Sequence, residues 1–152
     1  MNTKTLAVIA IGLWVVSAAF IGFKFVTGST VATADGREAV VLNASERDLI
    51  LAEMRGMLAA VQEIVAAVNE DDMAAVKETA HRVGVAEVQG VPAQLMLKLP
   101  IEFKKLGSAT HKGFDAVGLA ADFDGSQVLE KLEENLNRCV ACHEVYQLTT
   151  AK

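Results

Sequence analysis

The hydrophobic pattern of the chain begins with an unbroken apolar run over residues 6–23, which is followed by Lys24. An apolar run of about 18 or more residues is long enough to cross a bilayer as a helix, so we expect residues 1–26 to form a transmembrane anchor. A cleaved signal peptide is the alternative, with Lys4 as its basic start and the small residues of 16–19 as its cleavage site. Because the apolar run continues past that site, the pattern favours an uncleaved anchor.

The next segment, residues 27–44, is rich in small and polar residues and shows no long hydrophobic period. This composition is typical of irregular structure, so we expect a tether between the anchor and the rest of the chain. Ser45 is then placed to cap the first helix of a domain that covers residues 45–152. Asp48 falls in the first turn of that helix, beside the positive end of the helix dipole.

Four segments of the domain carry apolar residues at alternating spacings of three and four, which is typical of amphipathic helices. The stripe of the first helix consists of Ile50, Leu51, Met54, Met57, Leu58, Val61, Ile64, Val65 and Val68. The second helix is expected over about residues 72–85, and the third begins at Pro100. Asp124 and Gln127 form a capping-box pattern that opens the fourth. The pattern predicts an all-α fold, an antiparallel four-helix bundle of the kind whose core often holds a cofactor.

The composition supports helices and gives the domain an acidic surface. Two prolines, few aromatic residues and abundant Ala, Val and Leu favour helices over strands. Once Lys4 and Lys24 of the N-terminal segment are set aside, 12 Lys and Arg residues stand against 19 Asp and Glu residues. This negative charge argues against nucleic acid or anionic lipid as a partner. It is compatible with a basic electron-transfer protein as the partner of this domain.

The most informative motif is Cys139-Val-Ala-Cys142-His143, which contains the only two cysteines of the chain. The spacing is that of c-type haem attachment, in which two thioether bonds hold one porphyrin and the adjacent histidine is the proximal iron ligand. A structural zinc site normally needs four Cys or His ligands, and a dithiol redox motif is expected near a strand–helix–strand unit. A chance occurrence on a structural helix is the remaining alternative. We expect one covalent haem c on Cys139 and Cys142, with His143 as the proximal ligand.

The motif continues to Tyr146 on the last predicted helix, and residues 100–115 form a preceding helix that begins Pro-Ile-Glu-Phe. Together these segments resemble the cytochrome c-prime family, the class II c-type cytochromes. The resemblance covers roughly residues 44–150 and implies a four-helix bundle with its haem on the last helix. The chain departs from the family at Gln147, where a basic residue is common, and in its N-terminal anchor, which the family does not require.

The resemblance also implies that the first helix of the bundle covers the distal face of the haem. That helix presents either a methionine sulfur, which gives six-coordinate iron suited to electron transfer, or a leucine, which leaves the iron open to small gases. Met54, at the centre of the apolar stripe, is the expected distal ligand, and Met57 is an alternative. Another register places Arg47 near a haem propionate and Leu51 as a non-ligating distal residue. For any of these methionines, ordinary core packing is the competing interpretation.

These features predict a membrane-anchored monohaem c-type cytochrome that carries single electrons between periplasm-facing redox complexes. It would lie in a bacterial inner membrane with one span and its haem domain on the periplasmic side, as a free carrier or as a subunit of a respiratory or photosynthetic complex. The alternative function is a five-coordinate haem protein that binds nitric oxide or carbon monoxide.

Other features of the sequence add no second function. It shows no nucleophile–base arrangement and no phosphate-binding glycine loop, so enzymatic activity is not expected. His81 and His111 are interpreted as structural or surface residues. The redox partner, and pairing into homodimers as in many such bundles, are left open.

Overall fold

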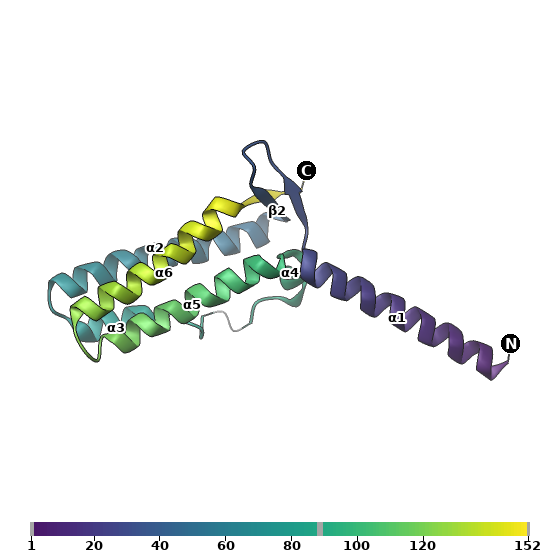
Figure 1. Cartoon of the computed structure of the whole chain (residues 1–152), viewed down its shortest axis with the longest axis horizontal. Coiled ribbons are helices and arrows are strands. Elements are labelled where there is room, and N and C mark those ends of the chain that lie inside the picture. The colour runs from purple at the N-terminus through teal and green to yellow at the C-terminus, as the bar shows by residue number, and fades with distance from the viewer. Residues whose placement is uncertain (1, 88–89, 152) are drawn as a thin grey trace.

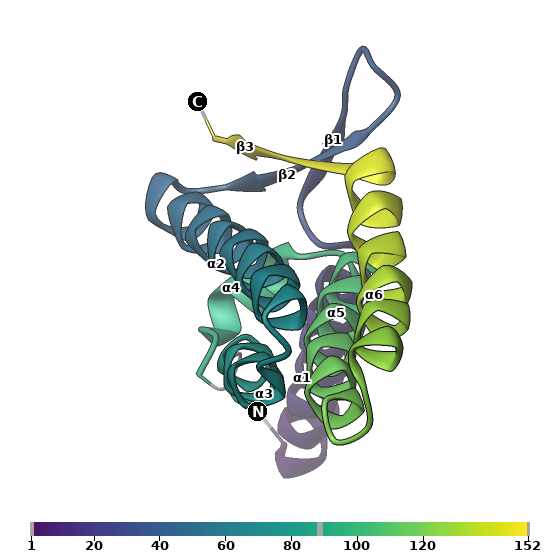
Figure 2. The ribbon, with the colours of Figure 1, turned by 90° about the vertical axis from the view of Figure 1, so that its left-hand side faces the viewer.

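The computed structural model describes residues 2–87 and 90–151, and it is mostly helical, as the sequence predicts. Its elements are α1 (Thr3–Thr27), β1 (Thr30–Ala32), β2 (Glu38–Leu42), α2 (Ala44–Asn69), α3 (Met73–Arg82), α4 (Ala93–Lys98), α5 (Ile101–Ala120), α6 (Gly125–Val145) and β3 (Tyr146–Thr150). Figure 1 shows α1 projecting away from a helical body in which α2, α3, α5 and α6 lie lengthwise beside one another. Figure 2 shows the same four helices from one end of that body.

A single apolar core joins the four helices of the body. Its most deeply buried members are Ala60 and Ile64 of α2, Val76 and Ala80 of α3, Phe114 and Val117 of α5, and Val128 of α6. Burying each of the larger aliphatic or aromatic side chains contributes about 1.5–3 kcal/mol. The three-and-four spacing of apolar residues therefore located the four helices. On α2 the buried face is rotated from the predicted stripe, because Ala67 is buried whereas Leu58 and Val65 of the stripe are exposed.

The N-cap of α2, the first helix of the body, lies two residues before the expected cap. Asn43, rather than Ser45, is the N-cap of α2, and its side-chain oxygen accepts a hydrogen bond from the backbone N–H of Glu46 at 2.8 Å. The Glu46 carboxylate accepts one in return from the backbone N–H of Asn43 at 2.9 Å, which completes a capping box. The prediction at Ser45 was wrong: Ser45 lies inside the first turn, and its hydroxyl donates to the side-chain oxygen of Asn43 at 2.8 Å.

The predicted tether is largely folded, which is the main correction to the domain boundaries. Within residues 27–44, β1 and β2 form an antiparallel hairpin, and β2 pairs in parallel with β3, so that Glu38 is opposite Tyr146. Val40 and Leu42 of β2 are buried against the helical body. The apolar residues of β2 form a short continuous run, Ala39–Leu42, without an alternating period, and the parallel partner of this strand lies more than 100 residues further along the chain.

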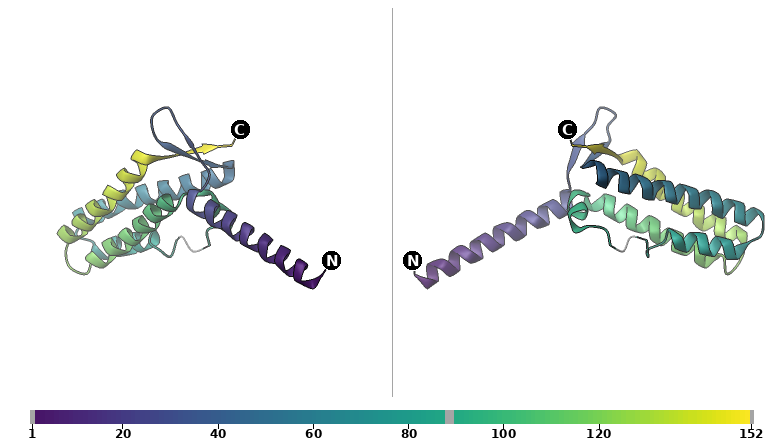
Figure 3. Two further views of the ribbon diagram at one scale, coloured as in Figure 1. Left: turned by 45° about the vertical axis from the view of Figure 1, so that its right-hand side comes forward. Right: turned by 180° about the vertical axis from the view of Figure 1, so that it is seen from behind.

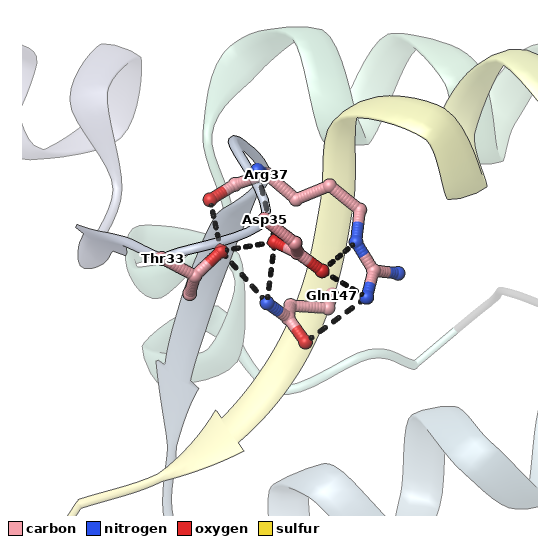
Figure 4. Close-up of polar contacts among 4 residues, drawn as sticks. All are labelled: Thr33, Asp35, Arg37 and Gln147. Atoms are coloured by element: carbon pink, nitrogen blue, oxygen red, sulfur yellow. Dashed lines mark hydrogen bonds and ion pairs between the residues drawn. The ribbon is translucent and has the colours of Figure 1, made fainter.

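Polar contacts hold the hairpin loop against the start of β3, as Figure 4 shows. Gln147 donates through its amide nitrogen to the hydroxyl of Thr33 at 2.9 Å, and Arg37 donates to Asp35 at 2.6 Å and 2.9 Å. Hydrogen bonds from Thr33 and Arg37 hold the pKa of Asp35 well below its ordinary value, so the carboxylate is charged at neutral pH. Tyr146, which was expected to continue the last helix, instead begins the strand that these contacts fix.

The N-terminal helix stands apart from this packing. α1 has 25 residues, none of them buried, and it is long enough and apolar enough to cross a membrane. At about 1.5 Å per residue, a helix of this length exceeds the roughly 30 Å hydrocarbon core of a bilayer. Figure 3 shows from two further sides that it extends away from the helical body. The prediction of an N-terminal apolar helix is confirmed.

The packing of β2 predicts a stability difference between two strand substitutions. Leu42 is 1 % exposed, so Leu42→Ala is expected to lower the free energy of unfolding by about 3 kcal/mol through lost burial and a cavity. Val31 of β1 is 51 % exposed, and Val31→Ala is expected to change it by no more than about 0.5 kcal/mol. Urea denaturation of the detergent-solubilised chain measures both. Equal, small effects would mean that β2 does not pack on the body.

Candidate functional site

The Cys-x-x-Cys-His motif occupies the last two turns of α6, directly before the sheet. Cys139 and Cys142 are free thiols and half-buried, whereas His143 is exposed. The helix ends at Val145 because Tyr146 takes an extended conformation, with φ −119° and ψ 150°, and enters β3. Pairing of β3 with β2 therefore fixes the end of the helix that carries the motif.

The buried face of α6 opens as it approaches the motif. Val128, Leu132 and Asn135 are buried, but further along the helix Leu136 is 39 % exposed and Val140 is 57 % exposed. The spacing of four residues puts His143 near Cys139 on the same side of the helix, yet His143 is exposed whereas Cys139 is half-buried. The motif thus lies beside aliphatic side chains that no described part of the chain fully covers.

The facing helix is α2, which runs antiparallel to α6 (Figure 1). At one end of the pair, a Cβ added to Gly125 would lie 3.1 Å from Val68. Met54 precedes Val68 by 14 residues and Cys139 follows Gly125 by 14 residues, so the equal rise of the two helices puts Met54 level with Cys139. At that level Met54 and Cys142 pack against one common apolar cluster.

This cluster, which we name the sheet-end cluster, is the apolar floor of the site. Its buried members are Val40 and Leu42 of β2, Ile50 of α2, Leu95 of α4, Leu99 directly after α4, and Phe103 of α5. Tyr146 packs on it with its ring edge-on to that of Phe103, at a centroid separation of 5.4 Å. The cluster gives the side chains of the motif an apolar and rigid boundary on one side.

The three candidate distal residues lie in different surroundings. Met54 is half-buried beside the sheet-end cluster together with Cys142. Met57 packs instead against the core of the helical body and lines a cavity next to Val83. Leu51 is half-buried and belongs to neither cluster. Of the three, Met54 is the one that shares a set of packing partners with the motif.

The donor set suits a haem attached to α6. Such a group needs two thiols for thioether bonds, an imidazole nitrogen for the iron and, when six-coordinate, a second axial ligand such as a thioether sulfur. Within the described residues the His143 ring makes no hydrogen bond or ion pair, so its nitrogens are available. Leu58 of α2, one turn from Met54, is 69 % exposed and adds to the uncovered aliphatic surface. A flat apolar macrocycle between α2 and α6 would cover it.

The two thiols do not resemble those of a dithiol redox centre. Reactive cysteines have a lowered pKa, because a nearby positive charge or helix N-terminus stabilises the thiolate. Burial instead raises the pKa of both Cys139 and Cys142, which lie near the C-terminal end of α6. Over residues 2–87 and 90–151, three or more Cys, His, Asp or Glu side chains are nowhere grouped as a metal-ion site.

A buried ion pair joins α2 to α5, one residue before Met54. His111 of α5 is 3 % exposed; its Nε2 lies 2.8 Å from the Glu53 carboxylate, and its Nδ1 donates to the Val83 carbonyl at 2.8 Å. The pair borders a cavity of about 570 Å³ between α2, α5 and the segment after α3. The sequence reasoning did not pair Glu53 with His111, although a carboxylate beside the apolar stripe of α2 was a usable signal.

Comparison of the chain with protein-family models, with curated proteins and with solved structures finds no significant match. The function is therefore argued from the residues of the site.

The Glu53–His111 pair predicts a pH dependence of stability. Burial of the ring opposes its charged form, but hydrogen bonds to Glu53 and Val83 outweigh it, and the pKa of His111 is raised above 6.5. The stabilisation is thus fully present below about pH 6.5 and is lost as pH rises through the raised pKa. His111→Gln should remove this dependence and lower the free energy of unfolding by about 2 kcal/mol.

Urea denaturation between pH 5.5 and 9 measures the dependence, with His81→Gln as the control, because the His81 side chain is 47 % exposed and lies near Asp115 outside the core. An unchanged pH profile in His111→Gln would contradict a charged pair in the core.

Proposed function

We propose that the chain is a membrane-anchored monohaem c-type cytochrome that carries single electrons. Its haem domain would be a four-helix bundle of α2, α3, α5 and α6 that resembles the class II c-type cytochromes. The observation that carries the proposal is that the thioether of Met54 and the thiol of Cys142 pack against the same sheet-end cluster, next to uncovered aliphatic side chains.

In this proposal Cys139 and Cys142 hold the haem by thioether bonds, and His143 supplies the proximal nitrogen. When bound, the haem supplies an iron that gains and loses one electron. The turn from α6 into β3 restrains His143, because the residues that follow it are hydrogen-bonded into the sheet. Met54 is the proposed distal ligand, and a thioether at that position favours the reduced iron and closes the site to gases.

The rest of the domain would tune and shield this centre. The sheet-end cluster excludes water from one side of the site and keeps the surroundings apolar, which favours the state of lower charge. The Glu53–His111 contact ties α2 to α5 one residue before Met54, so it restrains the helix that presents the thioether. No proton transfer or nucleophile is required of the chain, and we propose no enzymatic activity.

The proposed location is a bacterial inner membrane, with α1 as the single span and the domain on the periplasmic side, where haem is attached to c-type cytochromes. Its proposed partners are other redox proteins, most directly a respiratory or photosynthetic membrane complex. The acidic balance of the domain suits a basic docking surface on the partner.

The distal ligand gives the sharpest test of this function. The purified, reduced full chain should show a low-spin optical spectrum that carbon monoxide does not change. Met54→Ala should become high-spin and bind the gas, because the second axial ligand is lost. Met57→Ala is the matched control and should keep the wild-type spectrum, because that side chain points into the core of the body. Intact mass must first show one covalently added haem.

Two results would overturn parts of the proposal. A chain without added haem mass, with both thiols free to react, would remove the cytochrome assignment. A wild-type chain that is high-spin and binds carbon monoxide, with no response to Met54→Ala, would favour Leu51 as the distal residue and gas binding as the function.

A further inference from the structure

The connection between α1 and the domain is tightly packed rather than free. Gly28 ends α1 with φ +66°, a left-handed conformation that favours glycine. A Cβ at this position would lie 2.5 Å from the backbone nitrogen of Pro100 and 2.6 Å from the carbonyl oxygen of Lys98. The next residue, Ser29, donates its backbone N–H to the Lys98 carbonyl at 2.7 Å and accepts from Val41 at 2.8 Å. The two residues that follow α1 are therefore already packed against, and hydrogen-bonded to, the backbone of the domain.

A lysine of the domain also holds the end of α1. Lys104 of α5 donates to the backbone carbonyl of Phe25 and, at 3.1 Å, to that of Met96. Its ammonium group lies 3.5 Å from the centroid of the Phe25 ring, in the geometry of a cation–π contact. A positive charge at the C-terminal carbonyls of a helix is further favoured by the helix dipole. One side chain therefore links α1, α4 and α5.

The candidate haem site lies at the same end of the helical body as this junction. Leu95 lies in α4 and Leu99 directly follows it, in the segment that packs against the end of α1. Both leucines belong to the sheet-end cluster, against which Met54 and Cys142 pack. Figures 1 and 3 show that the end of α6 and the sheet lie beside the point where α1 leaves the body. The opposite tip, at the α5–α6 turn, is one length of the 20-residue helix α5 away, about 30 Å.

We propose that α1 and the domain form one rigid unit, which holds the motif end of α6 at the membrane surface for electron exchange with an integral membrane protein. The rigid junction stands on the contacts above, whereas the identity of the partner rests on the proposed cytochrome function. A domain held in this way does not swing outward to meet soluble carriers. Because electron transfer falls steeply with distance, the partner's redox centre must itself lie close to the bilayer surface.

The test compares matched variants of the full chain in lipid nanodiscs. Spin labels on Gly12→Cys in α1 and Glu130→Cys in α6 report the distance between anchor and domain, since Gly12 has no neighbouring atoms at its Cβ position and Glu130 is exposed. Fluorophores on the lipid headgroups report, through their quenching by haem, how close the haem lies to the membrane. An insertion of about ten Gly and Ser residues after Thr27 provides a flexible reference.

We expect the wild-type background to give one narrow distance distribution and strong headgroup quenching, and the insertion to broaden the first and weaken the second, each by about twofold or more. Gly28→Ala should resemble the insertion, because its Cβ meets backbone. Gly36→Ala should not, because Gly36 also has a positive φ but an open Cβ position. Lys104→Met should broaden the distribution, whereas Lys105→Met, at a solvent-exposed neighbour, should leave it unchanged.

Each contrary result has a separate meaning. A wild-type distribution as broad as that of the insertion would overturn the rigid junction. A narrow distribution with attached haem but no headgroup quenching would overturn the membrane-surface position and, with it, the choice of partner. Spin labels on Cys139 and Cys142, found by mass, would instead show that haem is absent, which overturns the proposed function and leaves the rigid junction to be judged from the distance alone.

Discussion

The parallel pairing of β2 with β3 is the contact on which the arrangement of the molecule depends. It joins the segment that follows α1 to the segment that follows the motif, and its register sets Glu38 opposite Tyr146. Through β2 it also buries Val40 and Leu42 against α2, α4 and α5. Without this pairing, the residues after α6 would form a free tail, and the last turn of α6 would lose its direct link to the segment that leaves α1.

The helices were predictable from the sequence because their information is local. Apolar residues at helical spacing located α2, α3, α5 and α6, and Asp124 was correctly recognised as the cap of α6, where it accepts from the backbone N–H of Gln127 at 2.8 Å. The sheet was missed because its evidence is not local. A five-residue strand with three buried residues resembles irregular structure in the sequence when its partner strand lies more than 100 residues away.

The candidate site was only partly visible in the sequence for the same reason. The spacing of Cys139, Cys142 and His143 can be recognised without tertiary information. Met54 was chosen as the candidate distal ligand from its place at the centre of the apolar stripe, without knowledge of how α2 and α6 are aligned. What the sequence did not contain was the separation of Met54 from Met57, three residues apart on one helix but packed into different clusters. The sequence also did not indicate the ion pair between Glu53 and His111, because that contact depends on how α2 and α5 are placed in the folded domain.

The long separation of β2 and β3 in the chain also orders the events of folding. Contacts between residues more than 100 positions apart form late, because closing so large a loop costs entropy before the pairing repays it. Under the proposed export to the periplasm, β2 would stay unpaired until the residues after the motif had crossed the membrane. Over that interval the thiols of α6 would not yet be enclosed by the sheet end, so the proposed covalent attachment at Cys139 and Cys142 would be easiest before the strand pairs. The sheet then completes the fold around whatever the helix carries.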